Sequence, residues 1–149
     1  IGHYNVNNEG SSDMYNKGAY MLHTLRQLIE DDQKWRAILR GLNTTFYHQT
    51  VTTKEIEEYL SNTSEINLVA FFNQYLRDVR IPIIEYKLQN GYMTYRYTNI
   101  VTNFDMPVKI KLKKGHQWIY PKAEWQKMDL KETSFTVDEN FLVKTVKAN

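Results

Sequence analysis

Tyr15 is the residue whose type and position best fit a role in chemistry. It falls in the first turn of an amphipathic helix that the pattern predicts from Asp13 onward, and Lys17 and Gly18 follow it. A neutral phenol donates a hydrogen bond, and a well-placed donor stabilises the oxyanion that develops in acyl-group chemistry. The competing interpretation is that a tyrosine beside an apolar helical stripe packs in the core. The residues alone leave both interpretations open.

The histidines give no sign of a metal site. They are scattered along the chain, and no two have the i, i+4 spacing of a helical zinc site: His3, His23, His48 and His116. The sequence contains neither the H-E-x-x-H motif nor a cysteine, so thiolate ligands and disulfides are excluded. We therefore expect this chain to bind no metal and no other cofactor.

Other catalytic patterns are also missing. The stretch "EGSSD" lacks the strand and the lysine spacing of a phosphate-binding loop, and no G-x-S-x-G nucleophile elbow occurs. The paired carboxylates Asp31–Asp32 and Glu57–Glu58 fit helix ends and helix faces. Glycosidase chemistry therefore has no particular support.

Four helices are expected in the first half of the chain. Apolar residues recur at helical spacing over residues 14–29 and again over residues 35–46, and Ser12 is the expected cap of the first helix. The third helix has the clearest start, because Thr52 and Glu55 fit a capping box. The fourth, "LVAFFNQYLRD", presents an aromatic face formed by Phe71, Phe72 and Tyr75.

The second half of the chain has the period of β-strands. "IPIIEYKL" and "MTYRYT" flank Asn90-Gly91, which is typical of a tight hairpin turn with positive φ. About six short strands without helices predict a small, immunoglobulin-like antiparallel β-sandwich. The fold class is therefore α+β, with a helical domain over residues 1–79 and a β-sandwich domain over residues 80–149.

Two groups of side chains on the expected sandwich need an interpretation. In "VKIKLKKGHQW" the lysines alternate with apolar residues, which is typical of the solvated face of a sheet, although a basic strand near aromatic residues could bind an acidic glycan or a phosphate backbone. The aromatic residues could line a ligand groove, but in a small sandwich we expect them in the core. They are Tyr92, Tyr95, Tyr97, Trp118 and Trp125.

Composition fits a folded protein without a strong charge preference. Of the 149 residues 42% are hydrophobic and 13% aromatic, and the net charge is +2. That charge is too small to favour nucleic acid as the partner. No apolar run approaches the roughly 20 residues of a membrane-spanning helix. The start at Ile1 suggests a processed or excised piece, and together with the missing cysteines it is compatible with an exported or periplasmic bacterial protein.

Three segments resemble a known family. "MYNKGAYMLHTLRQLI" is similar to the Y-x-K-G-a-x-x-L-x-x-L segment of aminopeptidase N-type zinc metallopeptidases, the gluzincins that include leukotriene hydrolase. "WRAILRGLNTTFYHQTVTTKEIEEYL" and "VAFFNQYLRDVRIPIIEYKL" resemble the following helices and the passage into a β-sandwich, with Tyr75 where many relatives carry tryptophan. The resemblance covers residues 10–90 well and is only architectural beyond Tyr92.

The resemblance implies a fold and a role for the motif. The four helices would be the end of a thermolysin-like catalytic domain, and Tyr15 would donate a hydrogen bond to the tetrahedral intermediate, while Lys17 and Gly18 have structural roles: the glycine permits close helix approach and the lysine fixes the turn. In the family a zinc ion polarises the same carbonyl oxygen, and the glutamate of H-E-x-x-H is the general base.

The parts of the family's site that this chain lacks define its expected partner. The zinc motif, the distal zinc glutamate and the G-x-M-E-N segment are absent, and in the family they lie upstream of the tyrosine. The chain is therefore expected to be an inactive C-terminal fragment that packs against an N-terminal catalytic half. The zinc and the peptide substrate would belong to the parent enzyme, and the helical part should expose apolar surface.

Two other interpretations of the chain's function remain. The chain could be a stand-alone module whose sandwich binds protein or glycan, or a degenerate peptidase relative that keeps the fold as an interaction domain.

Overall fold

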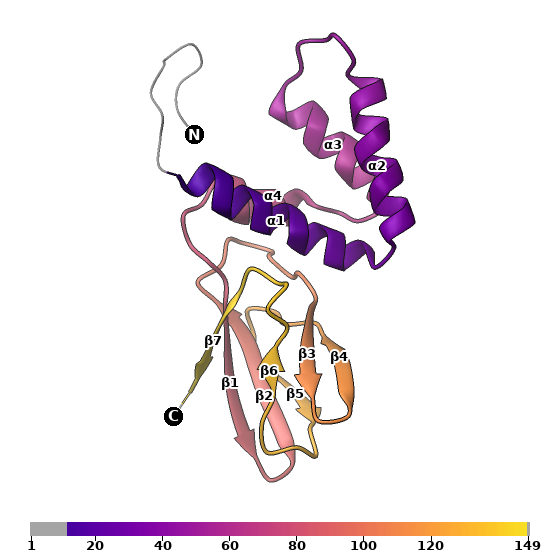
Figure 1. The fold of residues 1–149 in the computed structure, drawn as a ribbon. Coiled ribbons are helices and arrows are strands. Elements are labelled where there is room, and N and C mark those ends of the chain that lie inside the picture. The colour runs from indigo at the N-terminus through magenta and orange to yellow at the C-terminus, as the bar shows by residue number, and fades with distance from the viewer. Residues whose placement is uncertain (1–11, 149) are drawn as a thin grey trace.

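The computed structural model describes residues 12–148 (Figure 1). Four helices come first: α1 (Asp13–Ile29), α2 (Asp32–Thr45), α3 (Thr53–Ser64) and α4 (Val69–Leu76). Strands follow: β1 (Ile83–Gln89), β2 (Tyr92–Thr98), β3 (Val108–Leu112), β4 (Gly115–Ile119), β5 (Gln126–Asp129), β6 (Thr136–Val137) and β7 (Lys144–Lys147). The predicted fold class, four helices followed by a small β-sandwich, is confirmed.

The start of α3 has the predicted capping hydrogen bonds, and the start of α1 does not. At α3 the Thr52 side chain accepts a hydrogen bond from the Glu55 amide, and the Glu55 carboxylate accepts one from the Thr52 amide, so the capping box is confirmed. At α1 the prediction for Ser12 is wrong in its mechanism. Its side chain makes no capping hydrogen bond, and its carbonyl accepts the Tyr15 amide at 3.0 Å.

The strands form two sheets with the orders β5-β2-β1-β7 and β4-β3-β6. The predicted hairpin at Asn90-Gly91 is confirmed, because both residues have positive φ (51° and 80°), as a type I′ turn requires. One pairing differs from the antiparallel expectation: β7 runs parallel to β1, with Ile83 opposite Lys144. The chain returns to the end of the sheet where β1 begins, and the Lys144 amide donates to the Pro82 carbonyl at 2.9 Å.

The helices and the sandwich share a core. Figure 1 shows α1 and α4 lying across one end of the sandwich. From α4, Tyr75 packs edge-on against Phe104 with ring centroids 6.0 Å apart, and Phe104 packs in the same way against Tyr97 of β2 at 5.1 Å. These side chains belong to the same buried cluster as Leu25 of α1. Burying aromatic rings across this boundary therefore ties the two parts together.

The connection between α4 and β1 is held by hydrogen bonds from one buried side chain, that of Gln74. Gln74 is fully buried, its amide nitrogen donates to the Arg80 carbonyl at 2.8 Å, and its amide oxygen accepts the Val101 amide at 2.7 Å. The predicted boundary between residues 79 and 80 falls in this connection. Because the two parts share a core, their description as separate domains stays a prediction.

No helix within residues 12–148 is long and apolar enough to cross a membrane.

Candidate active site

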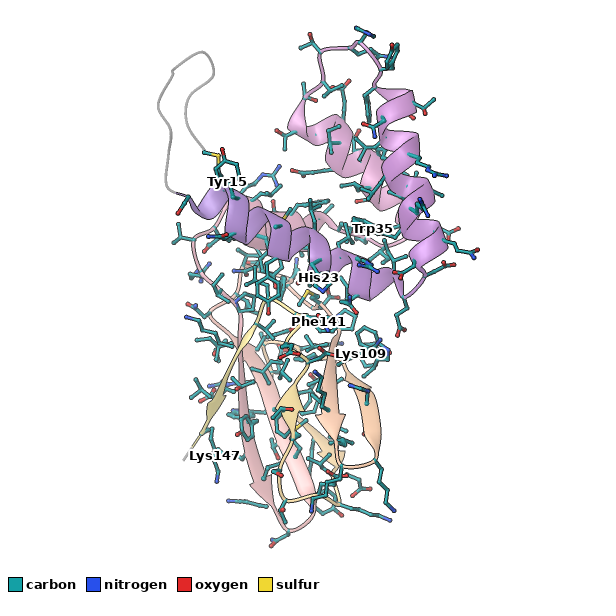
Figure 2. All side chains as sticks on the ribbon, viewed as in Figure 1. Tyr15, His23, Trp35, Lys109, Phe141 and Lys147 are labelled. Atoms are coloured by element: carbon teal, nitrogen blue, oxygen red, sulfur yellow. The ribbon has the colours of Figure 1, made fainter. Side chains whose placement is uncertain are left out.

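Tyr15 lies on the surface, in the first turn of α1. Its side chain is 73% exposed, so the alternative that it packs in the core is wrong. Within residues 12–148 its hydroxyl has no hydrogen-bond partner. Figure 2 shows it at the N-terminal end of α1, on the side of the helix away from the sandwich. The hydroxyl is therefore available to a group outside the described residues.

An exposed apolar stripe adjoins Tyr15. Met14 and Leu22 are both exposed, and helical spacing places Leu22 two turns beyond Tyr15 on the same side of α1. Leu39 of α2 and Val69 of α4 are further exposed apolar residues of the helical part.

The Lys17 side chain is held by a hydrogen bond and points in a different direction from Tyr15. Its ammonium group donates to the Asp78 carbonyl at 2.7 Å, which links the first turns of α1 to the segment after α4. The Asp78 carboxylate in turn accepts hydrogen bonds from the Arg80 side chain and amide, which lower the pKa of Asp78 to about 2, with a smaller contribution from the Lys17 charge. Lys17 thus holds the N-terminal end of α1 in place.

Gly18 has open space around it. A methyl group added at its α-carbon would meet no atom within 4 Å, so no other element of residues 12–148 approaches it closely. The close helix approach expected at this glycine is therefore not made within the described part of the chain.

The opposite side of α1 rests on the segment between β6 and β7, residues 138–143, which we call the β6–β7 loop. Tyr20 donates a hydrogen bond to the Glu139 carbonyl, and His23 Nε2 lies 2.9 Å from Asn140 Oδ1. Thr24 donates to the Asn140 carbonyl at 3.3 Å and accepts the Leu142 amide at 3.0 Å. Sequence reasoning missed these contacts, because nothing in the pattern pairs α1 with a loop near the other end of the chain.

Two of the lysines predicted to be solvated instead form ion pairs, Lys109 with the residue that ends α1 and Lys111 with the β6–β7 loop. Lys109 forms an ion pair with Glu30 and lies over the Trp118 ring, and Trp118 Nε1 donates to Glu30 Oε2 at 3.1 Å. Lys111 lies 3.6 Å from Asp138 in the β6–β7 loop. The apolar residues of β3 are buried as the alternation predicts, but a helix end and a loop cover part of the face that carries the lysines, so the prediction of a fully solvated face is wrong.

The aromatic residues of the sandwich divide between core and surface. Tyr95 and Tyr97 are buried as predicted, and Tyr97 donates to the Met106 carbonyl at 2.8 Å. The prediction is wrong for Tyr92 and Trp125, which are exposed on the outer face of the four-stranded sheet. Lys127 lies 3.9 Å from the centre of the Tyr92 ring, and Arg96 lies 4.6 Å from that of Trp125.

The described residues form no metal centre. No group of three or more histidine, aspartate or glutamate side chains within residues 12–148 is arranged to hold an ion. His23 faces Asn140, His116 lies 3.9 Å from Asp138, and His3 is outside the described residues.

Tyr15 does not line either of two pockets in the described part of the chain. One of about 540 Å³ lies between α3 and the start of α4, lined in part by Glu57, Asn62 and Val69. The other, about 630 Å³, lies beside the β6–β7 loop and is lined in part by Tyr20 and Tyr86.

Comparison with known proteins shows a solved structure with a similar fold. No protein-family model matches the chain, and no curated protein matches it by sequence. Among solved structures, it is similar to an aminopeptidase A of Legionella pneumophila in complex with aspartic acid, with a TM-score of 0.74 and 14% identity. The chain shares its fold with part of an aminopeptidase.

The extent of that similarity is informative. It covers 93% of this chain, so it includes both the helices and the sandwich. The chain spans only 18% of the Legionella protein's length. Most of that enzyme therefore has no counterpart in the sequence described here.

Proposed function

We propose that this chain is the C-terminal segment of a larger zinc-dependent metallopeptidase of the aminopeptidase type, in which Tyr15 stabilises the transition state. The observation that carries the proposal is the setting of Tyr15: an exposed hydroxyl without a described partner, on a helix held to the rest of the structure. The resemblance of residues 14–29 to the family's Y-x-K-G segment and the peptidase-related fold support it.

The chemistry assigned to Tyr15 is hydrogen-bond donation. When a nucleophile attacks a peptide carbonyl, negative charge develops on the carbonyl oxygen. A phenol placed 2.7–3.1 Å from that oxygen stabilises the charge, and a donor of this kind contributes about 10²–10³ in kcat. Tyr15 needs no proton transfer for this role.

The proposal places the remaining catalytic parts outside the described residues. No group of histidine, aspartate or glutamate side chains within residues 12–148 fits a zinc site, and the proposal assigns the general base to the same missing part. Alone the chain should hydrolyse no peptide. The exposed residues Met14, Leu22 and Leu39 would be covered when the catalytic part packs on the helices, because apolar surface of this kind favours association.

The test uses the natural full-length gene product and chelator-sensitive release of N-terminal amino acids. Tyr15→Phe should lower kcat about 10²–10³-fold, with little change in KM, because it removes a contact made in the transition state. Tyr47→Phe is the matched control, since Tyr47 is similarly exposed at 71% but lies beyond the far end of α2. Full activity of the Tyr15→Phe variant would remove the catalytic role.

One observation favours a second function. Lys127 lies beside the exposed ring of Tyr92, and the half-buried Arg96, which also pairs with Glu85, lies beside the exposed ring of Trp125, so cations and aromatic rings lie together on the outer face of the four-stranded sheet. A face of this kind suits an anionic protein or glycan, so the alternative is a non-catalytic interaction module, either a degenerate peptidase relative or a binding sandwich. A full-length product with no chelator-sensitive activity, in which Trp125→Ala abolishes binding of an acidic polysaccharide, would favour it.

A further inference from the structure

We propose that the β6–β7 loop of the sandwich positions Tyr15 for catalysis, with Thr24 as the positioning residue. The inference rests on the proposed function, because it assigns to the sandwich a part in the reaction that Tyr15 is proposed to assist. It implies that a β-domain with no catalytic group of its own sets the turnover rate.

The geometry of α1 separates the two roles. Thr24 lies nine residues after Tyr15, and at about 100° per residue this places the two side chains on opposite sides of the helix. Lys17, Tyr20 and Thr24 follow one another at i, i+3 and i+7, so they form a row along one side. Figure 2 shows the side of α1 near His23 facing the sandwich and Tyr15 facing away.

Thr24 is the last residue of this row and makes two hydrogen bonds to the loop. Its side chain is fully buried, and its hydroxyl both donates to the Asn140 carbonyl and accepts the Leu142 amide. One buried hydroxyl thus partners two backbone groups of the loop, the part-buried Asn140 carbonyl and Leu142 amide, and losing it would leave both without this partner. Because the hydroxyl fits between both groups, a roll or slide of α1 would break at least one of these bonds.

The loop that receives Thr24 is itself fixed to the sandwich and to α4. The Asp138 amide donates to the Lys109 carbonyl at 2.9 Å, and the Tyr75 hydroxyl donates to the Leu142 carbonyl at 2.8 Å. Phe141 is buried and packs edge-on against Trp118, with ring centroids 5.6 Å apart. The loop is therefore a rigid seat for the helix.

Both ends of α1 are held as well. Lys17 donates to the Asp78 carbonyl near the start, and Glu30, directly after the helix, contacts Lys109 and Trp118 of the sandwich. A helix held at three points cannot roll or tilt without losing contacts. The position of the Tyr15 hydroxyl follows from this seating, and a misplacement of about 1 Å in a catalytic group can cost about 10²-fold in rate.

The test is a double-mutant cycle in the full-length gene product. Thr24→Val keeps the shape of the side chain and removes both hydrogen bonds, and we expect kcat to fall at least about tenfold while KM stays the same. In the Tyr15→Phe background the same change should have no further effect on kcat, because the group that it displaces is already gone. Each variant is assayed well below its own melting temperature.

Two further variants separate positioning from general damage. Thr24→Ser keeps the hydroxyl and should restore kcat to near the unmodified value. Thr63→Val is the matched control, because the Thr63 hydroxyl bonds only to the Tyr59 carbonyl within α3, and kcat should not change. If Thr24→Val does not fold, Tyr20→Phe, which removes only the bond to the Glu139 carbonyl, takes its place in the same cycle.

The outcomes distinguish the inference from the proposed function. If Tyr15→Phe lowers kcat but Thr24→Val does not, or if the two losses multiply, the loop does not act through Tyr15 and the inference is overturned. If Tyr15→Phe leaves kcat unchanged, or the unmodified product is inactive, the proposed function fails and the inference fails with it. A loss at Thr24 that vanishes in the Tyr15→Phe background supports both.

Discussion

Thr24 and Leu142 share a 3.0 Å hydrogen bond across 118 positions of the chain. The bond joins the first helix to the loop before the last strand, so the seat of α1 forms only when nearly the whole described chain has folded. A helix of 17 residues with modest local stability thereby becomes part of one packed structure. In our proposal, residues far from the reaction control the orientation of Tyr15 in this way.

Gln74 should contribute strongly to stability. Gln74→Leu has a similar volume but removes the buried amide that partners the Arg80 carbonyl and the Val101 amide, two part-buried hydrogen bonds. We expect the free energy of unfolding to fall by about 2–4 kcal/mol, because each unsatisfied buried group costs about 1–3 kcal/mol. Urea unfolding followed by tryptophan fluorescence measures this. Gln89→Leu, at the exposed end of β1, should change it by less than about 0.5 kcal/mol, and an equal effect of both substitutions would contradict the assignment.

Asp78 should make the structure sensitive to acid. The hydrogen bonds from Arg80 lower the pKa of Asp78 to about 2 in the folded state, below the 3.8 of an unperturbed aspartate. The ionised group therefore contributes stability above about pH 4, and this contribution is lost as the pH falls toward 2.

The corresponding measurement compares variants, because other carboxylates such as Asp32 and Glu65 are shifted in the same direction. Asp78→Asn should lose less stability than the unmodified chain when urea unfolding is repeated at pH 6 and pH 2.5. Arg80→Gln removes the same side-chain interaction from the other partner and should behave alike. Identical pH dependence in all three proteins would show that the pair does not respond to acid.

The local features of the fold were predictable from the sequence. The aromatic face of α4, with Phe71, Phe72 and Tyr75, is buried as its spacing predicts. The capping box at Thr52 and the turn at Asn90-Gly91 formed because both depend on neighbouring residues only. Period and turn chemistry act over a few residues, so one sequence contains enough information to place them.

The contacts that seat α1 were not predictable in this way. Lys109 fits a solvated strand face until Glu30 is brought beside it, and their separation in the chain gives no signal of the pairing. Thr24 lies among apolar residues of a helix, where a buried threonine suggests nothing about its partner. The identity of Tyr15 as a candidate came from a motif, but its exposure depended on which sides of α1 the other elements cover.

Gly18 gives the last prediction, since the chain alone and the full-length protein should respond in opposite ways. In the chain alone, Gly18→Ala meets open space and replaces a glycine within a helix, so it should raise the free energy of unfolding by about 0.5–1 kcal/mol. In the full-length product, a catalytic part packed closely at Gly18 would collide with the new methyl group, and kcat/KM should fall.

Gly41→Ala is the matched control for the first effect, because its methyl group would collide with the Tyr59 hydroxyl and destabilise the chain itself. Thermal unfolding of the chain and peptide hydrolysis by the full-length product measure the two responses. Unchanged activity of Gly18→Ala in the full-length product would show that no element approaches this side of α1 closely, and the proposed packing of the catalytic part against Tyr15 would have to be moved elsewhere.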